Sequence, residues 1–232
     1  YDSGTSTGEW NNIGDNLNLG ENTVTPNTTT FARKSLNLFN INLSQFLDES
    51  GHNYFPTTNY ANLSLKYYYF IPFKVRIHKN MPVPVLVLVP GLNGDGEELA
   101  SRSAFKDFAS KEGFVIIAPT FIEDVQNWDD QTSYQYPKAW SGKALNDIIT
   151  NISQLKNLHI STLYMLGMSA GAQFVSRYSL LYPNYVTACA INAAGGSDDV
   201  PRYQATKFYY AIGTKDEKER QNVENTFYKQ AS

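Results

Sequence analysis

The stretch that decides the fold is Leu163-Tyr164-Met165-Leu166-Gly167-Met168-Ser169-Ala170-Gly171, an apolar run that leads into a Gly-x-Ser-x-Gly pattern. Apolar side chains continue at helical spacing from there to Tyr182. The pattern predicts a strand, a tight turn and a helix, with Ser169 in the turn and its hydroxyl exposed. We expect the two glycines because strand and helix approach too closely there for a Cβ atom. Ser169 is therefore a candidate nucleophile, and the alternative is a serine that only caps the helix.

Apolar runs and helical patterns alternate on both sides of this stretch. Pro82 to Val89 is a continuous run of leucine and β-branched residues, typical of a strand buried on both faces of a parallel sheet. The other strands predicted here are Phe114 to Phe121, Thr162 to Leu166, Val186 to Asn192 and Lys207 to Ile212, and the helices are Glu97 to Glu112, Trp140 to Leu155, Ala170 to Tyr182 and Glu217 to Gln230. This alternation predicts right-handed crossovers, so we expect an α/β fold with a mostly parallel central sheet flanked by helices.

The first part of the chain differs in composition. Residues 1–34 are dominated by Asn, Thr, Ser, Gly and Asp, so we expect a polar, extended arm. Residues 35–232 are predicted to form a single domain. Near its start, Ser35 to Phe46 alternates apolar with polar residues and Leu63 to Val75 is rich in Tyr, Phe and Val, which predicts two antiparallel strands.

Composition and charge argue against several classes of function. The chain has 232 residues, 19 of them basic and 22 acidic, for a net charge of -3, and the charges form no block of one sign. Nucleic acid is therefore not the expected partner. No apolar run is long enough to span a membrane. The single cysteine, Cys189, lies in an apolar run where burial is expected, and nothing in the sequence implies a metal or an organic cofactor.

A second informative stretch, Val89-Pro90-Gly91-Leu92-Asn93-Gly94-Asp95-Gly96, directly follows the first predicted parallel strand. A glycine-rich loop between a strand and a helix presents backbone N–H groups to an anion, either a phosphate or a transient oxyanion. Its spacing matches neither the dinucleotide-binding fingerprint nor the P-loop. Because a candidate nucleophile follows downstream, we predict that the N–H groups of Leu92 and Ala170 form an oxyanion hole.

Together these motifs resemble the α/β-hydrolases, and among them the secreted esterases that include polyhydroxybutyrate depolymerases and feruloyl esterases. The resemblance covers about residues 65–230 and also includes Tyr67 to Pro72 and Ile212 to Asp216. The family often has histidine where Pro90 and Met168 stand, but neither position belongs to its catalytic triad. The resemblance implies a serine hydrolase that cleaves a small-molecule or polymeric ester. It also implies a secreted, cell-surface or periplasmic location, for which four Asn-x-Ser/Thr sequons give weak support.

The resemblance further implies an acid and a histidine after the serine in the chain. Asp216 is the expected acid because it follows the strand Lys207 to Ile212. Asp198 and Asp199, in the loop after the preceding strand, remain alternatives, and any of the three could simply cap or turn the backbone.

The three histidines, His52, His78 and His159, all precede Ser169 in the sequence. His159 precedes the strand of the serine, so it is expected at the opposite end of the sheet. We therefore expect the catalytic histidine, with one more strand, to lie beyond residue 232. The alternative is a noncatalytic binding or scaffold protein with the hydrolase fold that lacks this base.

Aromatic residues gather between Pro119 and Trp140, after the carboxyl end of a predicted strand. Trp128, Tyr136 and Trp140 are candidate substrate-binding residues, since they would lie on the same rim of the sheet as Ser169. A packed lid over the core is an equally open interpretation.

Overall fold

The computed structural model describes residues 47–78, 80–126, 129–196, 198, 205–218, 220–223 and 225. These residues all belong to one compact unit, Leu47–Ser232. The predicted arm (1–34) and the strand predicted at Ser35 to Phe46 lie outside the described residues.

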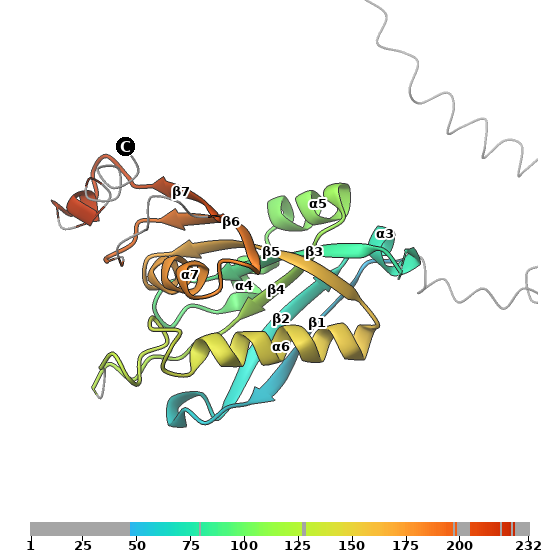
Figure 1. Cartoon of the computed structure of the whole chain (residues 1–232), viewed down its shortest axis with the longest axis horizontal. Coiled ribbons are helices and arrows are strands. Elements are labelled where there is room, and N and C mark those ends of the chain that lie inside the picture. Colours follow the sequence, from blue (N-terminus) through green and yellow to red (C-terminus); the bar gives the residue numbers. More distant parts are fainter. Residues whose placement is uncertain are drawn as a thin grey trace, which may run out of the picture. The chain divides into compact units, whose positions relative to one another are not determined.

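A seven-stranded sheet with the order β1-β2-β4-β3-β5-β6-β7 forms the centre of the described structure (Figure 1). Five strands run parallel to one another, namely β3 (Pro82–Val89), β4 (Val115–Pro119), β5 (His159–Met168), β6 (Val186–Asn192) and β7 (Lys207–Ala211). The antiparallel strands β1 (Glu49–Pro56) and β2 (Ser64–Ile71) extend one edge. The predicted mostly parallel α/β sheet is confirmed, and β3 and β6 have the predicted bounds.

Helices cover both faces of the sheet (Figure 1). The long helices α6 (Ser141–Lys156) and α7 (Ala170–Leu181) pack on one face, in a core that includes Val85 and Val87 of β3. The short helices α4 (Gly96–Ala100) and α5 (Ser103–Glu112) pack on the other face, in a core that includes Leu88. Successive residues of β3 therefore point into different cores, which explains why the whole run is apolar. None of the described helices is long and apolar enough to cross a membrane.

Two predictions of local structure were wrong, and two elements were not predicted. The helix predicted at Glu97 to Glu112 is two helices, α4 and α5, because the chain turns at residues 101–102. The strand predicted at Leu63 to Val75 ends at Ile71, and after Pro72 the chain forms a short helix, α3 (Phe73–Ile77). Strand β1, and the 3-10 helix η2 (Tyr60–Asn62) that follows it, were not predicted.

Elsewhere the local structure agrees with the sequence. Gly113 ends α5 with a φ of 81°, a conformation that favours glycine. Cys189 is buried in β6, as its apolar surroundings indicated. In the helix predicted at Glu217 to Gln230, residues 218, 220–223 and 225 are helical and the rest lie outside the described residues.

Candidate active site

Ser169 occupies the turn between β5 and α7, at the carboxyl end of the middle one of the five parallel strands. Its backbone has φ 53° and ψ -117°, a conformation that residues other than glycine rarely adopt. The Ser169 N–H donates to Asn192 O at 2.9 Å, and its carbonyl accepts from the N–H groups of Ala172 (3.0 Å) and Gln173 (3.2 Å). Bonds to β6 and to the first turn of α7 therefore hold the strained residue in place.

The two glycines of the pattern have no room for side chains. A Cβ atom on Gly167 would lie 2.3 Å from Gly171 O, and one on Gly171 would lie 2.2 Å from Pro90 O. Both distances are far shorter than any contact a real Cβ makes, and the neighbouring atoms belong to the backbone. The expected reason for these glycines, the close approach of strand and helix, is therefore confirmed.

The glycine-rich loop after β3 lies next to the serine. A Cβ atom on Gly91 would lie 3.6 Å from Ser169 Cβ, an ordinary van der Waals distance. Within the described part of the chain, the N–H groups of Leu92 and Ala170 have no hydrogen-bond acceptor. The Ala170 N–H is one of the first of a helix, which leaves it without an intrahelical partner. Two backbone donors are thus available beside Ser169, and their role as an oxyanion hole stays a prediction.

Asp216 follows β7, at the edge of the sheet where the carboxyl ends of β5 and β6 also lie. Its Oδ1 accepts a hydrogen bond from Glu217 N–H at 2.9 Å and lies 3.8 Å from Arg220 Nε. Arg220 Nη1 in turn donates to Ala193 O at 3.1 Å, directly after the end of β6. Asp216 therefore lies on the predicted edge and is connected through Arg220 to the strand that holds the Ser169 N–H.

Of the alternative acids, Asp198 is described and Asp199 lies outside the described residues. Asp198 Oδ1 accepts from Arg177 Nε of α7 at 2.9 Å, and the aspartate side chain is 58% exposed. The Arg177 guanidinium also lies 4.2 Å from the centre of the Tyr136 ring and donates to Gln135 O at 3.2 Å. Asp198 thus contributes to an ion pair that ties its loop to α7.

None of the three histidines, all of which are described, forms a hydrogen bond with Ser169. His159 is the first residue of β5 and pairs with Pro82, so it lies at the opposite end of the strand from Ser169, as expected. His52 is in β1, with Nδ1 3.3 Å from Glu97 Oε2. His78 directly follows α3.

The aromatic candidates have different surroundings. Trp140 directly precedes α6 with only 9% of its surface exposed, and its indole N–H donates to Thr132 O at 2.8 Å. Its ring packs edge-on against the buried Phe121, with ring centres 5.8 Å apart. Tyr136 lies under the Arg177 guanidinium, as described above, and Trp128 lies outside the described residues. Contact of these residues with a substrate stays a prediction.

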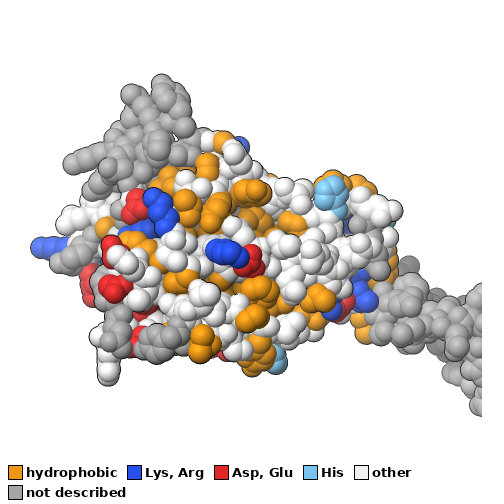
Figure 2. Space-filling view, turned by 60° about the horizontal axis from the view of Figure 1, so that its bottom comes forward, with side chains coloured by type: hydrophobic (Ala, Val, Ile, Leu, Met, Phe, Trp, Pro, Cys, Tyr) orange, Lys and Arg blue, Asp and Glu red, His pale blue; other side chains and the backbone are white. Residues whose placement is uncertain are grey.

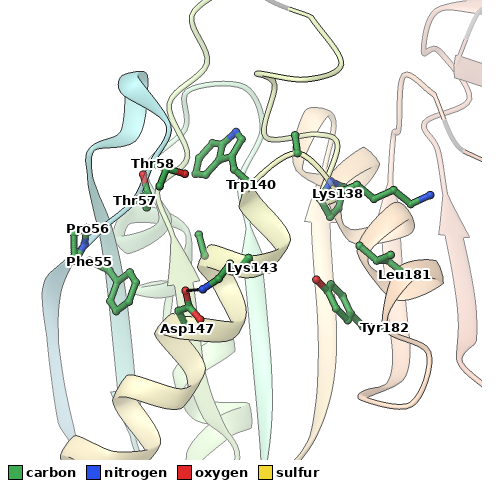
Figure 3. Close-up of a pocket in the computed structure, with 13 residues that line it drawn as sticks. Phe55, Pro56, Thr57, Thr58, Lys138, Trp140, Lys143, Asp147, Leu181 and Tyr182 are labelled. Atoms are coloured by element: carbon green, nitrogen blue, oxygen red, sulfur yellow. Dashed lines mark hydrogen bonds and ion pairs between the residues drawn. The ribbon is translucent and has the colours of Figure 1, made fainter.

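A cavity of about 760 Å³ lies between the end of β1, the first turns of α6 and the end of α7. Figure 3 shows Trp140 just before α6 and the ion-paired Lys143 and Asp147 on this helix, with Phe55 and Tyr182 on either side. Ser169 is not among the residues that line it.

Figure 2 shows the face that carries α6, on which positive and negative side chains lie next to each other and apolar ones are scattered. Among the described residues, no three acidic, histidine or cysteine side chains are grouped to hold a metal.

One polar residue near the site was missed by the sequence analysis. Glu123, in the segment between β4 and α6, is only 6% exposed, and its Oε2 accepts a hydrogen bond from Ser133 Oγ at 2.9 Å. Burial raises the pKa of this carboxyl, while the hydrogen bonds from Ser133 and from the Tyr134 backbone act in the opposite direction. A glutamate in a polar, aspartate-containing loop gives no sequence signal of burial.

The strand order, the helices on both faces and the strained serine after the central parallel strand together define the α/β-hydrolase fold. The resemblance predicted from the sequence is thus confirmed at the level of the fold. Neither protein-family models nor curated protein sequences match the chain.

Solved structures with this fold are similar to the chain. A ferulic acid esterase aligns with a TM-score of 0.60 at 14% identity, covering 80% of this chain and 85% of the esterase. Poly(aspartic acid) hydrolase-1 from Sphingomonas sp. KT-1 aligns with a TM-score of 0.58 at 17% identity over 78% and 84% of the two chains. The feruloyl esterase module from Clostridium thermocellum, complexed with sinapinate, has a TM-score of 0.56 at 12% identity over 80% and 73%. At these identities the similarity is one of fold.

Proposed function

We propose that the protein is a serine hydrolase of carboxylic esters that acts through an acyl-enzyme on Ser169. The observation that carries this proposal is the backbone of Ser169, at φ 53° and ψ -117° between two glycines that tolerate no Cβ atom. Such strain is retained where it exposes a reactive hydroxyl above the edge of a sheet. The free N–H groups of Leu92, in the neighbouring glycine-rich loop, and of Ala170, directly after the serine, support the same reaction.

In this mechanism a base removes the proton of Ser169 Oγ, which attacks the ester carbonyl carbon. The carbonyl oxygen becomes an oxyanion, to which the Leu92 and Ala170 N–H groups donate. The intermediate collapses to an acyl-serine as the alcohol leaves with the proton. Water activated by the same base then attacks the acyl-serine and releases the acid, which restores Ser169.

The base is proposed to be a histidine other than His52, His78 and His159, oriented by Asp216. Among the described residues β7 is an edge strand, and its Tyr209 is 67% exposed. A further strand beside β7 would place a following loop near Asp216 and Ser169. This is the arrangement that the resemblance implies.

An ester is the proposed substrate because two of the similar structures are named as a ferulic acid esterase and a feruloyl esterase module. Trp128, Tyr136 and Trp140 are proposed to contact its acyl or alcohol group. A secreted, cell-surface or periplasmic location is proposed with it, as for the esterases that the sequence resembles.

Chemical rescue tests this function, because free imidazole can replace a missing histidine base. The 232-residue chain and its Ser169→Ala variant are compared on p-nitrophenyl acetate, with and without imidazole. Without imidazole we expect neither to exceed buffer, and with it we expect the wild-type chain to exceed the variant by about tenfold or more. Equal rates for both chains in imidazole would favour the noncatalytic alternative. Full turnover without imidazole would place the base within residues 1–232.

A further inference from the structure

Asn93 follows the predicted oxyanion donor Leu92 and binds a distant segment through both atoms of its side-chain amide. Its Oδ1 accepts from Glu123 N–H at 2.6 Å, and its Nδ2 donates to Glu123 O at 3.3 Å. The two bonds resemble the backbone hydrogen bonds that join neighbouring strands, with the Asn93 amide in place of one backbone. Asn93 itself has a φ of 52°, which asparagine tolerates better than most other residues.

This pair of bonds is what attaches the tip of the glycine-rich loop to the rest of the protein. In the described structure, residues 91–93 have one other hydrogen bond, from Gly94 N–H to Gly91 O at 2.9 Å, and it is internal to the loop. The Leu92 side chain is 49% exposed, so packing does little to fix its backbone. The position of the Leu92 N–H therefore depends on Asn93.

The segment that Asn93 binds is itself fixed. Ile122, next to Glu123, is held in the same two-bond manner by the buried Asn62, whose Nδ2 donates to Ile122 O (2.6 Å) and whose Oδ1 accepts from Ile122 N–H (2.7 Å). The Glu123 carboxyl is buried and bonded to Ser133, as described above. Asn93 thus connects the exposed tip of the glycine-rich loop to a rigid anchor.

We propose that Asn93 is a positioning residue, which holds the Leu92 N–H at the place where the oxyanion forms. The inference rests on the proposed serine hydrolase function. Loss of one oxyanion donor costs about 100- to 1000-fold in kcat in other hydrolases. Loss of the bonds that only position such a donor should cost less, about tenfold, because the N–H remains but samples other orientations.

Asn93→Gly tests this directly, since glycine keeps the positive φ and removes only the side-chain bonds. Asn157→Gly is the matched control. Asn157 also has a positive φ, 51°, which glycine keeps, but it ends α6 and lies outside the glycine-rich loop and the segment that Asn93 binds. Each chain is assayed on p-nitrophenyl acetate in imidazole, and exchange of the Glu123 amide proton is followed by NMR.

We expect Asn93→Gly to lower kcat about tenfold with KM within about twofold, and to speed exchange at Glu123. Asn157→Gly should keep wild-type kinetics, and Asn93→Asp, which retains the acceptor for Glu123 N–H, should lie between wild type and glycine. Faster exchange with unchanged kcat in Asn93→Gly would overturn the positioning role while leaving the hydrolase function standing. A wild-type chain with no imidazole-dependent activity would overturn both.

Discussion

Gly171, in the first turn of α7, lies so close to Pro90 that a Cβ atom on the glycine would come within 2.2 Å of the proline carbonyl oxygen. The Val89 carbonyl oxygen would lie only 2.4 Å from the same atom. Helix α7, which begins directly after Ser169, therefore packs against the end of β3 and the start of the glycine-rich loop. The two halves of the candidate site are therefore packed directly on each other, backbone to backbone.

Gly171→Ala should destabilise the protein strongly, because the added methyl group meets backbone atoms that cannot rotate away. We expect the free energy of unfolding to fall by about 3 kcal/mol or more in urea unfolding. Gly91→Ala is the control, since its Cβ atom would meet only atoms at 3.6 Å, and it should change stability by less than about 1 kcal/mol. Equal stability of the two variants would mean that strand and helix are farther apart at Gly171 than the structure shows.

Glu123→Gln should change how stability depends on pH. Burial raises the pKa of the Glu123 carboxyl above its usual 4.5, so the folded protein keeps this proton to higher pH than the unfolded chain. The contribution of this carboxyl to the stability of the wild type is therefore fully present below pH 4.5 and is lost as pH rises through the raised pKa. The free energy of unfolding in urea, measured from below pH 4.5 to above the raised pKa, should therefore fall in the wild type relative to Glu123→Gln as the pH rises. If the wild type instead became more stable relative to the variant as the pH rises, the raised pKa of Glu123 would be contradicted.

The parallel half of the fold could be predicted because its signals are local. Strand β3 is one apolar run that ends in the fully buried Val87, Leu88 and Val89, and β6 is apolar apart from Thr187 and Asn192. Strand β1 could not be predicted in this way, since its sequence is polar and most of its side chains are exposed. Strand β1 forms because its backbone pairs with β2, and no pattern in the sequence of β1 itself indicates this pairing.

The errors near α3 and α4 have similar causes. The N–H of Phe73, the first residue of α3, donates to Asp48 Oδ1 at 2.7 Å. A residue 25 positions away thus helps to start a helix in a segment whose own sequence predicts a strand. Gly96 begins α4 against the backbone of Ala118, where a Cβ atom would lie 2.5 Å from the carbonyl oxygen. Such contacts between distant segments override local periodicity.

The candidate site likewise combines a feature that local sequence determines with contacts between segments far apart in the chain. The strained turn of Ser169 follows from five consecutive residues, so the sequence could predict it. The bonds from Asn93 to Glu123 and from Asn62 to Ile122 join residues 30 and 60 positions apart. Only the fold brings these together, and the two asparagines carry no motif that would have identified them.

Asp216→Asn should separate a catalytic from a capping role for this aspartate. Asparagine keeps an oxygen that accepts from Glu217 N–H, so the unfolding midpoint should change little. In the enzyme with its histidine base, turnover should fall by about two to four orders of magnitude, because the base loses the carboxylate that orients it. Asp198→Asn, which weakens only the pair with Arg177, should retain turnover within about threefold. The reverse pattern would assign the role to Asp198.

The central claim, that Ser169 is the nucleophile, is tested most directly by mapping a covalent adduct. The chain is treated with a fluorophosphonate in the presence of imidazole, digested and analysed by mass spectrometry, beside Ser169→Ala. We predict one phosphonyl adduct per chain, on the peptide that contains Ser169, and none in the variant. An adduct on another serine, labelling that survives in Ser169→Ala, or an unmodified wild-type chain would contradict the claim.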